Sequence, residues 1–456
     1  VTLHKCSFDS CKAGTNGGAI HLNSARLVMD DLSYVRENYA ADGGGMYIEN
    51  EATLEGGNVE KNTAMSIGGN VLTNGVVEIK NVKILNGEAF NGGGVSMTPN
   101  SHLTIKKSTL ANNIAKNKGG GISSTRTRII FEDTVIRDCT AKLGGGIFLD
   151  GDSTLSGTSQ ITRNKATENG GGVYLNVGIF TLSNSIIVKN EAVINGGAIY
   201  LLAPSAILLQ NNEIKENKAN HGGGFSASTS KGDIEIKSEG TNIIQQNYGN
   251  IAGGNFYLSS PPEGSCFQAS LKNLEIDGGI APYGGGVYLS SCTSKLEKCS
   301  VKNNRVESRL NDAKGGGLYI DGTAVTLDSV SVEHNFAEGS GGGIYVIGDK
   351  SSVVSIGSTT LRHNEANHKG GGIALAKSSS SILGINVEEN KAVYGGGINI
   401  EDGSPTLQSV TIRGNHAFGN LAEGGGLRVE GLFSVTSVKL LNVVVSENAV
   451  IGEKAK

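Results

Sequence analysis

The feature that most constrains the fold is a cluster of two or three glycines that recurs along the whole chain. A large apolar residue follows each cluster, and most successive residues of this kind are 24 to 27 positions apart. Ile147, Val173 and Ile199 are three consecutive examples. A fixed period of this length is the signature of a solenoid, in which each repeat stacks on the one before it.

A second motif, apolar-x-x-Asn-x-Ala, precedes most of the glycine clusters, as in "IVKNEA" (187–192) and "VEENKA" (387–392). Its asparagine usually lies eight or nine residues before the apolar marker. We predict that these asparagines stack and hydrogen-bond through their amides, in a structural rather than a ligand-binding role. The predicted stack contains Asn164, Asn190, Asn364 and Asn390.

Within one repeat, short runs rich in β-branched and aromatic residues alternate with Gly, Asn and Ser, and no helical period persists. The chain is therefore predicted to be all-β, a right-handed parallel β-helix of about 16–17 coils of about 26 residues each. The glycine clusters would form tight corners, at backbone conformations that other residues avoid.

The repeat runs without interruption, which predicts a single continuous β-helix over residues 1–456. Longer coils are expected around 256–318 and 398–427, where extra residues extend the loops. Both ends of the chain are repeat-like, so we expect a segment of a longer solenoid.

Composition and charge exclude several classes of partner and cofactor. The formal net charge is −4 with both signs mixed along the chain, which argues against a nucleic-acid partner. The longest apolar stretch, 199–209, is too short for a membrane span. No cysteine pair or histidine spacing indicates a metal site, and no cofactor is predicted. Cys266, Cys292 and Cys299 allow either one disulfide or free buried thiols.

In the strand after each glycine cluster, the second residue is expected to point outward. At this position aromatic residues gather in two runs of consecutive coils, which would form a ladder of stacked rings. The ladder either stabilises adjacent coils or presents an exposed stripe to a partner, and both roles are compatible. The candidate ladder residues are Phe148, Tyr174, Tyr200, Tyr257, Tyr288, Tyr319 and Tyr345.

The sequences "GGAI" (17–20 and 196–199) and "GGG[IVL]" elsewhere, with the asparagine motif before them, resemble the repeats of the chlamydial polymorphic membrane proteins. That family's signature is GGA[ILV] with FxxN; here an aliphatic residue usually replaces the Phe. The resemblance covers essentially the whole chain. It implies a surface-exposed adhesive passenger.

We therefore predict an extracellular or cell-surface protein with a non-catalytic structural or adhesive role, such as a subunit of a fibre or surface appendage. Its partners would be other protein subunits or surface glycans. The alternative is a carbohydrate-active enzyme, a polysaccharide lyase or glycoside hydrolase, or a carbohydrate-binding module. Its best carboxylate pair is Glu401 with Glu430, at equivalent places in adjacent coils.

Overall fold

The computed structural model describes residues 1–202, 205–228, 233–260, 268–308, 312–348, 352–432 and 436–452. These residues form about 16 coils of a parallel β-solenoid and contain no helix. Two compact units divide the chain, Val1–Ala219 and Asn220–Lys456. Whether one continuous β-helix spans residues 1–456 stays a prediction.

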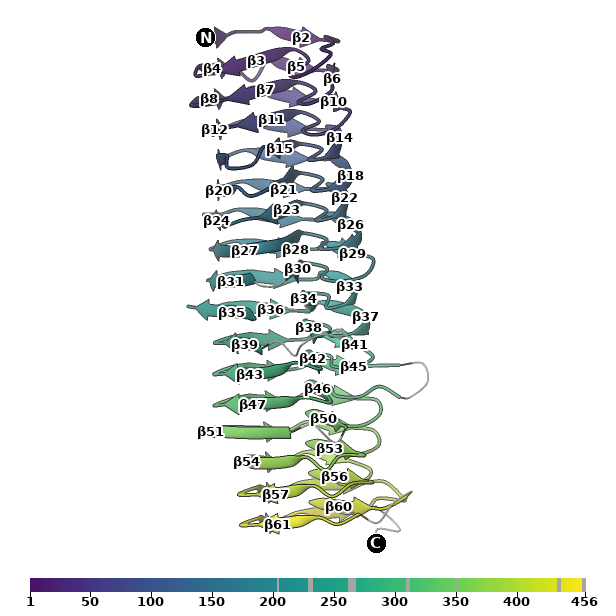
Figure 1. The fold of residues 1–456 in the computed structure, drawn as a ribbon. Helices are drawn as coiled ribbons and strands as arrows, with labels where there is room; N and C mark the ends of the chain where they lie inside the picture. Colours follow the sequence, from purple (N-terminus) through teal and green to yellow (C-terminus); the bar gives the residue numbers. More distant parts are fainter. Residues whose placement is uncertain are drawn as a thin grey trace. The chain divides into compact units, whose positions relative to one another are not determined.

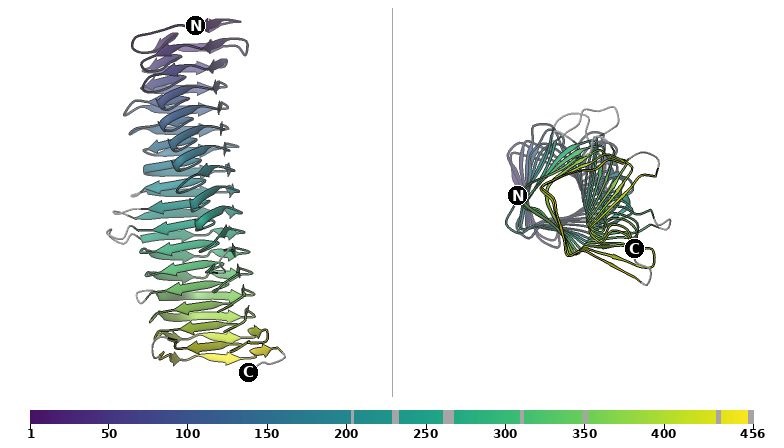
Figure 2. Two further views of the ribbon diagram at one scale, coloured as in Figure 1. Left: turned by 90° about the vertical axis from the view of Figure 1, so that its right-hand side faces the viewer. Right: turned by 90° about the horizontal axis from the view of Figure 1, so that it is seen from below.

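A coil of the first unit consists of four short strands: β7 (Met46–Glu49), β8 (Ala52–Glu55), β9 (Asn58–Glu60) and β10 (Thr63–Ala64). Burial alternates along β8, because successive side chains of a strand point to opposite faces. Figures 1 and 2 show the strands of successive coils of this unit lying one above another. The strands that follow its glycine clusters are β3 (Ile20–Asn23), β7, β11 (Val71–Asn74), β15 (Val95–Met97), β19 (Ile122–Ser123), β23 (Ile147–Asp150), β27 (Val173–Ser183) and β30 (Ile199–Leu202).

The second unit repeats the same plan. One of its coils consists of β42 (Val287–Ser290), β43 (Thr293–Glu297), β44 (Ser300–Lys302) and β45 (Arg305–Val306). The strands that follow its glycine clusters are β34 (Phe225–Ser228), β38 (Phe256–Ser259), β42, β46 (Leu318–Asp321), β50 (Ile344–Ile347), β53 (Ile373–Ala376), β56 (Ile398–Glu401) and β60 (Leu427–Glu430).

The register places equivalent residues directly beside one another. In the first unit, Val173 pairs with Ile199 and Tyr174 with Tyr200, in parallel. Val173 and Ile199 are both fully buried and point into the coil. The apolar markers of the sequence repeat therefore form the core.

The three positions of a glycine cluster require glycine to different degrees and for different physical reasons. Gly170 has φ +70°, a left-handed conformation that favours glycine. At Gly171, an added Cβ would lie 2.4 Å from the carbonyl oxygen of Gly197 in the next coil, so no side chain fits. The third position is less restricted, since Ala198 occupies it one coil later.

Candidate functional site

The second unit contains a continuous stack of four tyrosine rings, one from each of β38, β42, β46 and β50. The ring centroids of Tyr257 and Tyr288 are 5.0 Å apart, and those of Tyr288 and Tyr319 are 4.9 Å apart. Tyr319 and Tyr345 follow at 5.3 Å, with a 19° angle between the ring planes. This geometry is that of the predicted ladder.

The first unit contains a shorter stack. The centroids of Phe148 and Tyr174 are 5.1 Å apart, and those of Tyr174 and Tyr200 are 5.0 Å apart. Lys118 Nζ lies 4.5 Å from the centroid of Phe148, over the ring. The ammonium group therefore makes a cation–π contact with this aromatic stack.

Of the two roles that the sequence left open for the ladder, the burial of the rings favours contacts between coils over an exposed stripe. Phe148, Tyr174, Tyr200 and Tyr345 are buried, and the other three rings are half-buried. The physical reason is that the rings face outward from the strand but other side chains cover them, such as Leu143 in the first unit. Burial raises the pKa of Tyr174 to about 12 and shifts that of Tyr345 in the same direction. The ladders therefore contribute mainly to packing between coils.

The tyrosine ladder of the second unit stops after Tyr345. In the next coil its register partner is Ala374, and the partner of Ala374 is Asn399. A pocket of about 330 Å³ lies at this position, with Tyr345, Ala374 and Asn399 among its lining residues. His368, Lys369 and Glu401 also line it. The pocket is thus the place in the stack where a ring is missing.

The carboxylates of Glu401 and Glu430 are held in an ion-pair network. Lys369 Nζ bonds to Glu401 Oε2 and lies 3.7 Å from Glu430 Oε2. Arg428 Nη1 donates to Glu430 Oε2 at 2.6 Å. This bond to Arg428 is the main reason that the pKa of Glu430 is lowered. A general acid at neutral pH needs a raised pKa, so Glu430 is poorly suited to that role.

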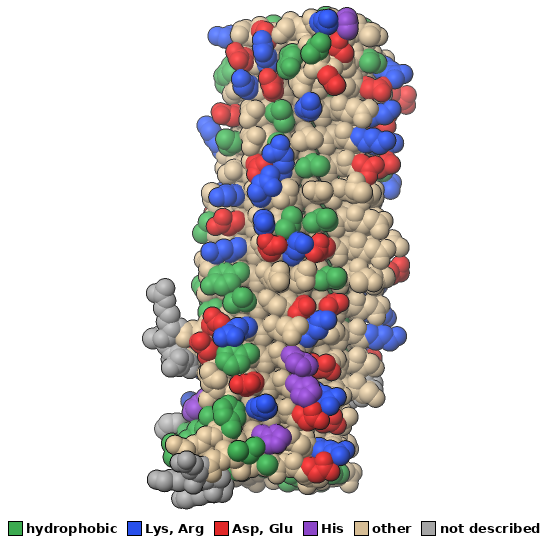
Figure 3. Space-filling model, turned by 180° about the vertical axis from the view of Figure 1, so that it is seen from behind, with side chains coloured by type: hydrophobic (Ala, Val, Ile, Leu, Met, Phe, Trp, Pro, Cys, Tyr) green, Lys and Arg blue, Asp and Glu red, His purple; other side chains and the backbone are tan. Residues whose placement is uncertain are grey.

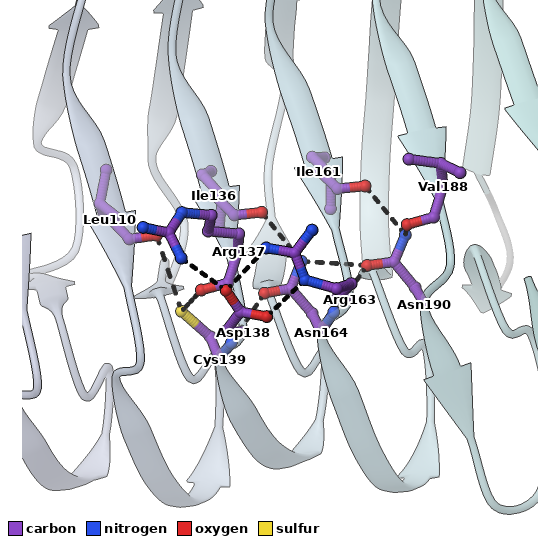
Figure 4. Close-up of polar contacts among 10 residues, drawn as sticks. All are labelled: Leu110, Ile136, Arg137, Asp138, Cys139, Ile161, Arg163, Asn164, Val188 and Asn190. Atoms are coloured by element: carbon purple, nitrogen blue, oxygen red, sulfur yellow. Dashed lines mark hydrogen bonds and ion pairs between the residues drawn. The ribbon is translucent and has the colours of Figure 1, made fainter.

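The asparagines form hydrogen-bonded ladders inside the corner of most coils. Asn190 Oδ1 accepts from both the backbone N and Nδ2 of Asn164, each at 3.0 Å. Asn164 Nδ2 also donates to the carbonyl of Ile136 (Figure 4). In the second unit, Asn390 Oδ1 accepts from Asn364 in the same way, at 2.9 and 3.0 Å. The ladder satisfies buried backbone groups that the corner would otherwise leave without partners.

Two members of the ladder lie outside the asparagine motif, and sequence reasoning missed them. Gly87 stands at the motif position of one coil, where no side chain can continue the ladder. Asn70, the third residue of the preceding cluster, fills the gap: its Oδ1 accepts from Asn62 at 2.9 Å, and its Nδ2 donates to Asn113 at 3.1 Å. In the second unit, Asn255 compensates for Gly279 by the same geometry. The signal was available, because "GGN" replaces "GGG" only beside those two coils.

Of the described cysteines, Cys139, Cys292 and Cys299 are buried, whereas Cys6 and Cys11 are partly exposed. Cys299 is a free buried thiol, so it is not bonded to Cys292, and Cys266 lies outside the described residues. Cys139 occupies the ladder position between Asn113 and Asn164. Its backbone N donates to Asn164 Oδ1 at 3.0 Å (Figure 4). Burial raises the pKa of Cys139 to about 12 and that of Cys299 to about 11.

Elsewhere, charges of both signs are mixed on the surface, and several form ion pairs between neighbouring coils, such as Lys189 with Glu216. On the face drawn in Figure 3, Lys and Arg side chains are interspersed with Asp and Glu side chains. Within the described ranges, no three His, Cys, Asp or Glu side chains form a group that could hold a metal ion. The same part of the chain contains no helix with the length and apolar character that a membrane crossing requires.

Comparisons with known proteins identify the fold and nothing finer. The family model described as the right handed beta helix region matches residues 67–247 and 263–449. No curated protein sequence matches the chain significantly. Among solved structures, the chain is similar to the A-module of the mannuronan C-5 epimerase AlgE6 of Azotobacter vinelandii, at 13% identity and a TM-score of 0.28, over 87% of this chain and 90% of that one. So low a TM-score supports no functional conclusion.

Proposed function

Because the chain belongs to the right-handed β-helix family, we propose that it is a non-catalytic extracellular or cell-surface scaffold with a structural or adhesive role. The main support for the proposal is that side chains pointing outward from the strands contact side chains of the neighbouring coil. Examples are the stacked rings of Tyr288 and Tyr319 and the ion pair of Lys369 with Glu401.

The resemblance of the repeats to the chlamydial polymorphic membrane proteins supports the adhesive part of this proposal. Its partners would be other protein subunits or surface glycans. A surface built from regularly repeated coils offers many equivalent positions to such partners, which suits multivalent contact.

A carbohydrate-active enzyme is the second candidate, and one observation favours it. Glu401 lines the pocket beside Ala374, so a carboxylate is available where a small ligand fits. Against this role, Lys369 bonds to the Glu401 carboxylate, and Arg428 binds that of Glu430.

The two candidates are separated by one pair of assays on the intact chain. In the first assay, the protein is incubated with acidic and neutral polysaccharides, and the length of the polysaccharide chains is measured. In the second assay, surfaces are coated with native or heat-unfolded protein, and the retention of cells and of further copies of the chain is measured. We expect unchanged polysaccharides and retention by the native protein alone. Chain shortening that disappears in Glu401→Gln, together with no retention, would establish the enzyme instead.

The role of the ladders is tested with matched double variants, Tyr288→Ser with Tyr319→Ser, and Phe148→Ser with Tyr174→Ser. Because these rings are half-buried or buried, circular dichroism first has to show that each variant is folded. A folded ladder variant that has lost retention would place the adhesive surface on that unit.

A further inference from the structure

The outer face of one sheet of the first unit carries exposed apolar side chains in four successive coils. The sheet contains the neighbouring strands β6 (Tyr39–Ala40), β10, β14 (Glu88–Asn91) and β18 (Ile114–Lys118), which lie one above another in Figure 1. Single exposed apolar side chains are common on protein surfaces, but a contiguous group of them marks an interaction surface. The group consists of Tyr39, Met65, Phe90 and Ile114, which are 39%, 61%, 48% and 47% exposed.

These four residues form an apolar patch with a hollow at its centre. They line one cavity of about 320 Å³ together with Glu88 and Lys116. The inward-facing residues of the same strands, such as Ala64 and Ala89, are buried in the core. The core therefore uses only the inner face of this sheet, and the apolar patch on the outer face is open to a partner.

The two charged groups at the apolar patch have no ion-pair partner within the part of the chain that the structure describes. Glu88 and Lys116 are both exposed, and neither forms an ion pair with a described residue. Farther along the same sheet the charges are paired, since Lys142 Nζ lies 3.1 Å from Glu168 Oε1. The apolar patch thus offers one positive and one negative group to a partner.

A second copy of the chain is the partner that this arrangement fits. In a two-fold contact both copies use the same surface, so each contact occurs twice. The Lys116 ammonium of one copy would pair with the Glu88 carboxylate of the other, and the reciprocal pair would form as well. The apolar side chains of the two patches would pack together between these pairs. A surface that bears both charges complements itself, whereas a partner of one charge sign would leave one of the two groups unmatched.

We propose that the apolar patch is the contact through which two copies of this chain associate side by side. This inference rests on the proposed role of the chain as a scaffold, and it names one partner and the surface that binds it. At the usual strand spacing, the four coils of the patch extend over about 14 Å. A contact of this size is at the small end of protein interfaces, so the association is weak and reversible.

The test is sedimentation equilibrium of the intact chain from low to high micromolar concentration, with two charge-reversal variants. We expect a reversible equilibrium between monomer and dimer. Glu88→Lys and Lys116→Glu each place like charges opposite one another and should weaken association roughly tenfold or more. An equimolar mixture of the two variants should restore association, because each mixed pair again brings opposite charges together.

Two further variants test the apolar contacts and the specificity of the charge effect. Met65→Ser combined with Phe90→Ser changes only exposed side chains, so the chain should fold, and association should be lost. Glu191→Lys is the matched control, since it reverses an exposed charge on the same sheet outside the apolar patch. It should associate as the unchanged chain does.

Three results would overturn the proposal. They are a chain that stays monomeric at every concentration, a dimer that survives the Met65→Ser and Phe90→Ser changes, and a mixture that associates no better than either charge variant alone. If the chain is monomeric and the Met65→Ser and Phe90→Ser changes abolish the retention of cells, the apolar patch binds a foreign partner instead.

The same measurements separate this inference from the proposed function. If the chain stays monomeric but native protein still retains cells, the adhesive role stands and the contact between copies fails. If the mixed charge variants associate while the chain shortens polysaccharides and retains no cells, the contact stands and the non-catalytic role fails.

Discussion

Replacing Asn190 with alanine interrupts the asparagine ladder of the first unit at one coil. The change leaves the buried backbone N–H of Asn164 without its acceptor, Asn190 Oδ1. It also removes the bond from Asn164 Nδ2 to Asn190 and the two shorter bonds that Asn190 Nδ2 donates, to Ile161 O and Asn217 Oδ1 at 2.9 and 3.0 Å. A third contact of Asn190 Nδ2, with Val188 O, is 3.3 Å long.

The cost follows from the four shorter bonds. An unsatisfied buried donor costs about 1–3 kcal/mol, and each of the other three bonds is worth about 1 kcal/mol net, so we expect Asn190→Ala to lower local stability by about 4–6 kcal/mol. Since about 1.4 kcal/mol corresponds to a factor of ten, the equilibrium for local opening should rise at least about a thousandfold.

Hydrogen–deuterium exchange is the suitable assay, because a long array of repeats need not unfold in a single two-state step. Peptides that cover Asn164 should exchange far faster in Asn190→Ala. The matched control in the same coil is Glu191→Ala, since Glu191 is exposed and its ion pair with Lys165 is 3.7 Å long. A surface pair of this kind is worth at most about 1 kcal/mol. Equal exchange in the two variants would refute the structural role of the ladder.

Three further predictions concern other parts of the structure. Asn70→Gly should destabilise its coil because the ladder bonds to Asn62 and Asn113 are lost, and Gly87→Ala should destabilise the same coil because an added Cβ would lie 2.2 Å from the carbonyl oxygen of Gly93; hydrogen exchange of residues 60–90 measures both, and unchanged exchange in the two variants would contradict the compensation. Cys139, whose pKa burial raises to about 12, should resist alkylation in the native state while the partly exposed Cys6 reacts, as peptide mapping after brief iodoacetamide treatment would show. Hydrogen bonds from Lys272 and Lys295 lower the pKa of Glu297 to about 2. The contribution of the Glu297 carboxylate to stability is therefore complete above its ordinary pKa of about 4.5 and disappears as the pH falls through 2. The difference in stability between the unchanged chain and Glu297→Gln should vanish over the same pH range, and a difference that persists at pH 1.5 would refute this prediction.

The fold was predictable from sequence because a solenoid repeats its constraints. Val173 and Ile199 carry the same role one period apart, so the pattern alone locates their strands, and the predicted all-β right-handed parallel β-helix is confirmed. The surface-exposed adhesive role, the partners and the extracellular location stay predictions, since no feature of the fold specifies them.

Exposure of the ladder could not be predicted, because it depends on side chains from other parts of the coil. The second residue of a strand does point outward, yet Leu143 packs against the stack that contains Tyr174. The sequence pattern defines the direction of a side chain, whereas its burial depends on what the loops place above it.

The network around Glu401 was hidden for a similar reason. Lys369 precedes its glycine cluster by one residue and lies 32 positions from Glu401, and only the folded coils bring the two together. The pocket at Ala374 was visible in outline, since alanine follows four tyrosines at the outward position.

The most direct test of the account is whether equivalent residues of successive coils are in register. Thr154 and Thr181 are register partners on neighbouring strands, so cysteines introduced at both positions would have Cα atoms about 5 Å apart, within reach of a disulfide. Cysteines at positions 154 and 183, in place of Thr154 and Ser183, would be about 8 Å apart, which is too far. Under mild oxidation, we predict that mass spectrometry finds the 154–181 crosslink and not the 154–183 crosslink. Efficient formation of the second, or failure of the first in folded protein, would contradict the stacked arrangement.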